Sequence, residues 1–162
     1  MKIAIVYHSE SGNTEKVAHI IAEGARIHDA LEVQTMSLDH LDEAFISDAH
    51  AVIFGCPTYC GSFSWQMKKW FDTTDLNLAG KLGSVFATEN YLGGGADVAE
   101  LGMVGHILVR GMLAYSAGIG KGNPFTHYGA VTVKSGDDWH QNRARLFGQR
   151  IAEKAMELFG KE

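Results

Sequence analysis

The sequence is poor in the residues that staple small secreted proteins or hold structural metals. Its 162 residues include only two cysteines, Cys56 and Cys60. That number is too small for a disulfide framework or a four-cysteine zinc site. The eight histidines are scattered along the chain without the spacing of a metal site. We therefore expect neither a disulfide scaffold nor a bound metal.

Long apolar runs and an excess of basic residues are also missing. No apolar stretch approaches membrane-spanning length, and Ile3–Tyr7 is too short for the core of a secretory signal. The formal net charge of −5 removes the electrostatic driving force for non-specific binding to nucleic acid. We therefore expect a cytoplasmic protein whose partners include neither a membrane nor nucleic acid.

Two common nucleotide-binding motifs are absent as well. The sequence has no Gly-Lys-Ser/Thr ending of a nucleoside-triphosphate loop and no Gly-x-Gly-x-x-Gly of a dinucleotide fold. What it does have is a short apolar stretch, Lys2–Tyr7, followed by a helical pattern from Thr14 to Arg26. The turn between this predicted strand and helix is rich in polar side chains and contains one glycine: Ser9, Ser11, Gly12, Asn13 and Thr14.

This turn is typical of an anion site. The first N–H groups of a helix have no intrahelical partner, and the helix dipole favours negative charge there. The side-chain donors are neutral, and the nearest lysine, Lys16, already lies in the predicted helix. Neutral donors suit one terminal phosphate that binds without a metal. The alternative is that Ser, Asn and Thr simply cap the helix, for which they are favoured residues.

The rest of the chain alternates strands with helices, which predicts one α/β domain over residues 1–162 with a parallel sheet covered on both faces. Its expected strands are Lys2–Tyr7, Leu31–Leu38, Ala51–Gly55, Lys81–Thr88 and Met112–Ala117, with Ala130–Val133 as a short extension. The later helices are expected from Ser64 to Phe71, Asp97 to Arg110 and Gln141 to Phe159, the last with Leu146, Ile151, Ala155 and Leu158 on its inner face. The expected fold is a three-layer sandwich whose five-stranded parallel sheet has the order 2-1-3-4-5.

In such a sheet, ligands bind where the carboxyl ends of the strands meet the following loops. Those loops are Ser9–Thr14, Thr58–Phe63 and Glu89–Gly95, and the second and third carry Tyr59 and Tyr91. Two aromatic side chains that flank a crevice suit a flat ring. A phosphate at one end and a flat heterocycle at the other describe FMN.

The predicted FMN-binding residues therefore come from all three loops. They are Ser9, Glu10, Ser11, Gly12, Asn13, Thr14, Pro57, Thr58, Tyr59, Cys60, Gly61, Thr88, Glu89, Asn90, Tyr91, Gly93 and Gly94. The triple glycine at 93–95 is expected to leave space beside the ring. No catalytic side chain is predicted, since FMN itself carries out the electron transfer.

Several segments resemble one family. Residues 7–18 are similar to the FMN-phosphate loop of flavodoxin-like flavoproteins. Residues 55–68, GCPTYCGSFSWQMK, look like the Gly-x-Pro-Thr-x-x-Gly-x-x-Ser-x-Gln-Met segment of the NAD(P)H:quinone reductases once called tryptophan-repressor-binding proteins. Residues 81–86, the triple glycine, Gly111-Met112 and residues 128–130 fit the same subfamily.

The chain departs from that subfamily in three places. The connection over residues 38–48 is too short for the subfamily's long insertion, which is linked to tetramer assembly. Tyr59 stands where the subfamily often has Arg, and Val109-Arg110 where it has a pair of histidines. The resemblance nevertheless covers nearly the whole chain.

Three functions follow. The resemblance implies an NAD(P)H-dependent quinone reductase that transfers a hydride, with NAD(P)H and quinone as its substrates. The alternative is a flavodoxin that carries single electrons between partner redox proteins, and the third is an interaction module that senses flavin or binds none. The assembly is left open, with a homodimer among the options.

Overall fold

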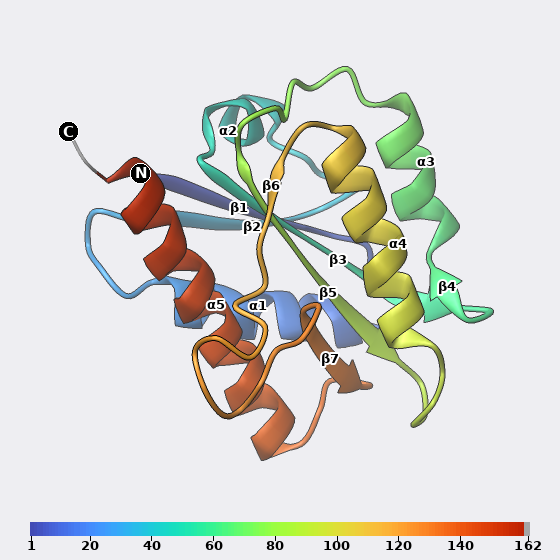
Figure 1. Ribbon diagram of the computed structural model, residues 1–162. Helices are drawn as coiled ribbons and strands as arrows, with labels where there is room; N and C mark the ends of the chain where they lie inside the picture. The colour runs from blue at the N-terminus through green and yellow to red at the C-terminus, as the bar shows by residue number, and fades with distance from the viewer. Residues whose placement is uncertain (161–162) are drawn as a thin grey trace.

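The computed structural model describes residues 1–160 and shows a central sheet with helices on both faces (Figure 1). The sheet is built on β1 (Lys2–Tyr7), β2 (Glu32–Ser37), β3 (Ala51–Tyr59) and β5 (Leu82–Glu89), in the order β2-β1-β3-β5. All of these neighbours pair in parallel. The three-layer α/β architecture and the strand order match the prediction from the sequence.

The fifth position of the sheet is filled by two short strands. β6 (Leu113–Ala114) pairs with the beginning of β5, and β7 (Ala130–Val133) pairs with its end. The segment 115–129 lies between them without forming a strand. The strand expected over Met112–Ala117 is therefore too long, and Ala130–Val133, expected only as a short extension, supplies the larger part of this fifth position. With the short strand β4 (Ser62–Phe63), which pairs antiparallel with β3, the sheet has seven strands.

One face of the sheet is covered by α1 (Asn13–Ala25) and α5 (Asp138–Phe159), and the other by α2 (Glu43–Asp48), α3 (Trp65–Thr73) and α4 (Ala96–Val109). β1 and β5 are buried on both faces, which explains the continuous apolar run of β1. In the α1–α5 contact, a Cβ on Gly148 would lie 2.0 Å from the carbonyl oxygen of Ile21. The two helices therefore approach as closely as they do only because glycine stands there.

Side chains cap the starts of α3 and α5, and α5 begins three residues before the predicted Gln141. The Ser64 hydroxyl accepts a hydrogen bond from the Met67 N–H at 3.4 Å, and the Asp137 carboxylate accepts one from the His140 N–H at 2.9 Å. The prediction that Leu158 faces the core is wrong, because its side chain lies near the end of α5 and is 44% exposed. Within residues 1–160, no helix is both long and apolar enough to cross a membrane.

Candidate functional site

A groove of about 320 Å³ lies at the carboxyl ends of β1, β3 and β5. Three loops converge there because the parallel strands all point to the same edge of the sheet. The predicted residues that line the groove are Glu10, Ser11, Asn13, Thr14, Pro57, Thr58, Tyr59, Thr88, Glu89 and Asn90. The sheet therefore brings together members of all three predicted loops.

The first loop leads into α1 without a side-chain cap. Gly12 occupies the N-cap position with φ of +82°, and no side chain accepts a hydrogen bond from the first turn of the helix. The interpretation of the polar residues as helix caps is therefore wrong. The N–H groups at the start of α1 keep their donor capacity, and the helix dipole favours an anion beside them.

The hydroxyl groups around this helix start are arranged for a further partner. The Oγ of Ser9 is buried and has no hydrogen-bond partner within residues 1–160. The Thr14 and Thr88 hydroxyls lie 2.8 Å apart, and the Asn13 amide donates to the Ser11 hydroxyl at 3.0 Å. A buried hydroxyl without a partner costs free energy, so Ser9 marks a position where a ligand acceptor fits.

The second loop is a tight hairpin rather than the open loop expected from the sequence. Thr58 pairs with Phe63 and Tyr59 with Ser62, so β3 runs into β4 through Cys60 and Gly61. Both turn residues have positive φ, 49° and 75°, as a two-residue hairpin turn requires. The hairpin fixes the wall of the groove, since it holds the backbone on either side of the turn.

Two side chains of this hairpin face the groove. The Thr58 hydroxyl is buried and has no hydrogen-bond partner within the described residues. Tyr59 packs edge-on against His8 at 6.4 Å between ring centroids. Burial raises the pKa of Tyr59, and the nearby Glu10 carboxylate raises it further, so the phenol stays neutral. Thr58 and Tyr59 together offer a hydrogen-bonding hydroxyl next to an aromatic surface.

The third loop is held by Glu89 and by a glycine contact. The buried Glu89 carboxylate accepts a hydrogen bond from the Ala96 N–H at 3.1 Å, at the start of α4. A Cβ on Gly95 would lie 2.8 Å from the Cα of Gly61. The triple glycine therefore lets the second and third loops touch at Gly95, instead of only leaving space beside the groove.

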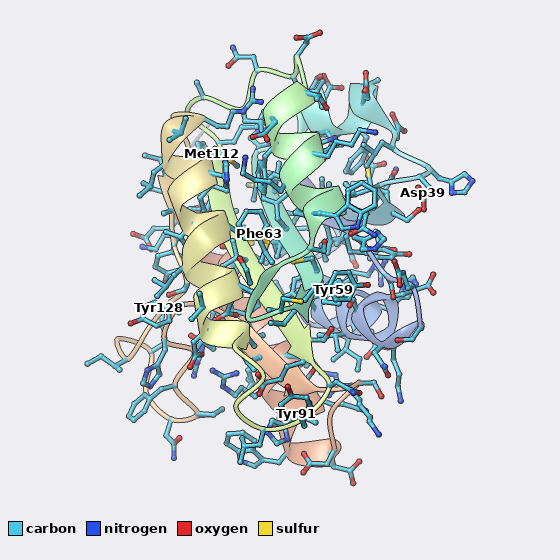
Figure 2. The ribbon with its side chains drawn as sticks, turned by 90° about the vertical axis from the view of Figure 1, so that its right-hand side faces the viewer. Asp39, Tyr59, Phe63, Tyr91, Met112 and Tyr128 are labelled. Atoms are coloured by element: carbon cyan, nitrogen blue, oxygen red, sulfur yellow. The ribbon has the colours of Figure 1, made fainter. Side chains whose placement is uncertain are left out.

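The other predicted residues lie beside the groove but do not line it: Ser9, Gly12, Cys60, Gly61, Tyr91, Gly93 and Gly94. The Tyr91 side chain is 66% exposed and stands on its own loop, apart from Tyr59 (Figure 2). The two tyrosines therefore do not form a closed aromatic clamp in this conformation.

Lys134 lines the groove, although the sequence did not predict it there. It follows β7 with φ of +52°, and its N–H donates to the Glu89 carbonyl at 2.7 Å. No other lysine or arginine lines the groove in the described part of the chain. Lys134 lies outside the three predicted loops, and only the pairing of β7 with β5 brings it to the groove.

The donor set fits an anionic mononucleotide of flavin type. Uncapped N–H groups and neutral hydroxyls suit the phosphate, and Lys134 adds one positive charge. Tyr59 and the orphaned Thr58 hydroxyl suit a flat ring with polar edges. These groups belong to different secondary-structure elements, so the ligand would bridge the ends of β1, β3 and β5.

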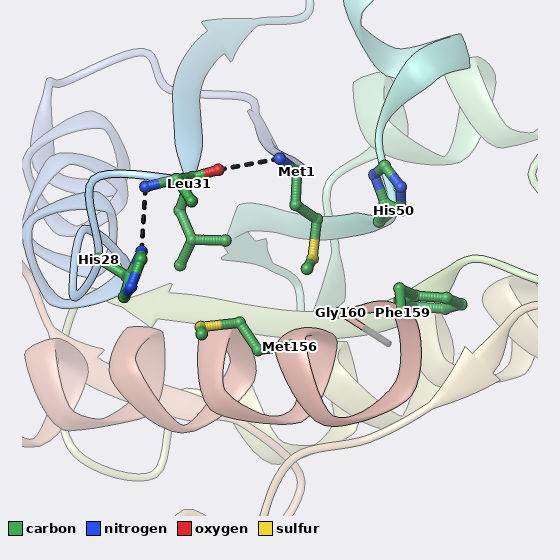
Figure 3. Close-up of a pocket in the computed structure, with 8 residues that line it drawn as sticks. Met1, His28, Leu31, His50, Met156, Phe159 and Gly160 are labelled. Atoms are coloured by element: carbon green, nitrogen blue, oxygen red, sulfur yellow. Dashed lines mark hydrogen bonds between the residues drawn. The ribbon is translucent and has the colours of Figure 1, made fainter. Parts of the chain in front are cut away.

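A second hollow, of about 460 Å³, lies at the opposite end of the sheet (Figure 3). It is formed where the two ends of the described chain meet, with Met1 and Leu31 facing Met156 and Phe159. The Met1 ammonium group donates to the Ala30 carbonyl at 2.9 Å there. This end carries the amino ends of the strands, whereas ligands of open α/β sheets bind at the carboxyl ends.

Known proteins match this chain over most of its length. The family model described as Flavodoxin matches residues 5–95, which include all three loops. A flavodoxin from Clostridium saccharobutylicum is 45% identical over 98% of this chain and 100% of its own length. An NAD(P)H dehydrogenase (quinone) from Archaeoglobus fulgidus is 30% identical over 97% of this chain and 98% of its own. The crystal structure of a flavodoxin, WrbA-like protein from Agrobacterium tumefaciens superposes with a TM-score of 0.80 at 26% identity, covering 96% of this chain and 98% of that one.

Proposed function

This chain belongs to the flavodoxin family, and from that membership we propose that it carries electrons one at a time between partner redox proteins. Its cofactor is FMN, as in its flavodoxin relatives. FMN supplies the redox chemistry, since it exchanges one or two electrons, and the protein binds and orients it. The observation that carries the proposal is the match to a flavodoxin along the full length of both chains.

We assign the FMN phosphate to the start of α1. Ser9, Ser11 and Thr14 would donate hydroxyl hydrogens to it, together with the N–H groups that follow Gly12. These donors are neutral and preorganised, so they bind the phosphate without a metal. A ligand that lacks the phosphate loses all of these contacts.

We assign the flavin ring to the space between the hairpin at Tyr59 and the third loop. Tyr59 would pack against the ring, and Thr58 and Asn90 would bond its polar edge. The contact between Gly61 and Gly95 closes the two loops on each other beside the ring. In this arrangement the protein holds the cofactor in place and leaves its outer edge near the surface for electron exchange.

An anaerobic titration tests this function. The protein loaded with FMN is reduced stepwise while its visible spectrum is recorded. A carrier of single electrons should pass through two resolved one-electron steps, and excess NADPH alone should leave the flavin oxidised over many minutes. Adding a catalytic amount of an NAD(P)H-oxidising flavoprotein should then reduce it. Rapid reduction by NADPH alone, or a single two-electron step, would contradict the carrier function.

A second candidate is an NAD(P)H:quinone reductase, the function that the sequence resemblance favours. One observation supports it: Tyr91 does not line the groove, so in this conformation it does not cover the ring. Hydride transfer needs one open face of the ring, and two covering tyrosines would block it. The 30% identical quinone dehydrogenase points the same way, more distantly than the flavodoxins. Reduction by NADPH followed by reoxidation by benzoquinone would establish this function.

A further inference from the structure

Helix α4 has an apolar solvent-facing side, unlike the other long helices. Its exposed positions include Val98, Leu101, Leu108 and Val109, and Val109 is 85% exposed. Of the charged or titratable residues of α4, Glu100 is buried and His106 is half-buried against Phe63 and Phe71. Asp97, in the first turn of α4, is the one that is exposed, and it lies one turn before Leu101 at the edge of this side. By contrast, the exposed positions of α1 include Glu15, Lys16, His19 and Glu23.

A glycine stands in the middle of this apolar side. Gly105 is exposed, and a Cβ built on it would meet nothing within 4 Å. Its φ is not positive, so the backbone does not require glycine, and glycine inside a helix is less stable than alanine. Gly102, one turn earlier, differs because its Cβ would meet the Phe63 ring at 2.6 Å. The packing within the chain thus explains Gly102 but not Gly105, which allows another backbone to approach α4 closely.

The apolar side continues beyond the helix. Leu113 on β6 and Tyr128 are each about half exposed, and Leu92 in the third loop is exposed beyond the start of α4. Figure 2 shows α4 facing the viewer with Tyr128 at its flank. We call this set the α4 face: Leu92, Val98, Leu101, Gly105, Leu108, Val109, Leu113 and Tyr128. An exposed apolar patch of this extent marks an interaction site.

The charges of the α4 face point to a second copy of this chain as its occupant. The face contains no lysine or arginine, so it lacks the attraction to anionic lipid headgroups that surface-bound helices use. Its one neighbouring acidic residue is Asp97 at the start of α4, and a single carboxylate is not the acidic patch that would steer a charged redox partner. Interfaces between identical subunits are the more apolar class, and a two-fold axis makes an apolar patch complementary to itself.

The position of Gly105 sets the geometry of such a pair. Leu101 lies four residues before it and Leu108 three residues after it, on the same side of the helix. If two α4 helices cross antiparallel at Gly105, Leu101 of each copy meets Leu108 of the other. Stable interfaces bury about 800 Å² from each partner, more than two crossing helices cover, so the flanking Leu113 and Tyr128 belong to the contact.

We propose that the protein forms a two-fold symmetric dimer through the α4 face, with Gly105 at the crossing point of the two helices. This assembly places the third loop of each subunit at the edge of the interface, because Leu92 is part of the face. It uses only residues outside the groove lining, so it does not depend on the function proposed above.

The test is the mass in solution, measured by size-exclusion chromatography with light scattering over a range of concentrations. The protein should run at twice the chain mass, and Leu101→Glu and Leu108→Lys should each be monomeric. An equimolar mixture of these two variants should regain the dimer mass, because the glutamate introduced in one chain then meets the lysine introduced in the other. Gly105→Arg should also be monomeric, since its side chain has space only when α4 is unpartnered.

Leu158→Glu on α5 is the matched control, because Leu158 is as exposed as Leu101 but lies off the face. It should remain dimeric, and FMN binding should show that every variant is folded. A wild-type protein that stays monomeric at all concentrations would overturn the proposal. So would variants that stay dimeric, a variant mixture that stays monomeric, or wild-type protein that is monomeric in solution and sediments with lipid vesicles through α4.

Discussion

The hydroxyl oxygens of Thr14 and Thr88 lie 2.8 Å apart, although 74 residues separate them in the sequence. Thr14 belongs to the first turn of α1 and Thr88 to the end of β5, and both are buried. The contact ties the proposed phosphate loop to the third loop. One of the two hydroxyls donates to the other, which leaves the second hydrogen free for a ligand acceptor.

Replacing Thr14 with valine should therefore weaken FMN binding with little change in shape. We expect a loss of roughly 1–3 kcal/mol, the cost of removing a partner from a charged group. Riboflavin has no phosphate, so its affinity should barely change. Isothermal titration with both ligands measures the difference, and Thr35→Val on the edge strand β2 serves as the control. Equal weakening of both ligands would argue against a phosphate role for Thr14.

Lys134 should supply the positive charge that the first loop lacks. We expect Lys134→Gln to weaken FMN binding by about 1–3 kcal/mol and to make the remaining affinity less sensitive to salt. Lys121→Gln, a change of an exposed lysine outside the groove, should leave FMN affinity unchanged. If the charge acts on the phosphate, riboflavin binding stays constant; if it acts on the ring, both ligands weaken. An unchanged FMN affinity would remove Lys134 from the site.

Glu100 should make the stability of the fold depend on pH. Its side chain is buried on α4, one carboxylate oxygen has no hydrogen-bond partner in residues 1–160, and burial raises its pKa well above the usual value despite Arg143 nearby. The folded state therefore binds more protons than the unfolded state at any pH between the unfolded and the folded pKa. The free energy of unfolding should fall as pH rises through that window, by about 1.4 kcal/mol for each pH unit.

Glu100→Gln should remove this loss, because the amide stays neutral at every pH. Urea unfolding from about pH 5 to about pH 8 should give a flatter profile for the variant than for the wild type. Glu32→Gln on the exposed edge strand should leave the wild-type profile intact. Parallel profiles for the wild type and Glu100→Gln would show that Glu100 does not titrate in this range.

The two cysteines should differ in reactivity. Cys56 is fully buried and burial raises the pKa of its thiol to about 12, whereas Cys60 is exposed at the hairpin turn. The thiolate is the reactive form, so iodoacetamide should modify Cys60 alone in the folded protein. Mass spectrometry should find one modified cysteine in the native protein and two after unfolding in guanidinium. Modification of Cys56 without unfolding would contradict the burial.

Local patterns along the chain were enough to predict most of the elements and their order. Continuous apolar runs such as residues 3–7 identify buried parallel strands, and Ser64 identifies a helix start, because strand burial and helix capping depend on residues close in the chain. The same local signals placed the three loops at one edge of the sheet. Fold class, strand order and cofactor could be predicted on this basis.

Which side chains meet in the groove could not be predicted in this way. Lys134 reaches the groove because β7 pairs with the end of β5, and Gly95 needs to be glycine because Gly61 approaches it from another loop. Tyr59 faces the groove while Tyr91 does not, although both lie at the carboxyl end of a strand. These results depend on strand register and loop approach, which arise in the folded molecule from contacts between residues far apart in the chain.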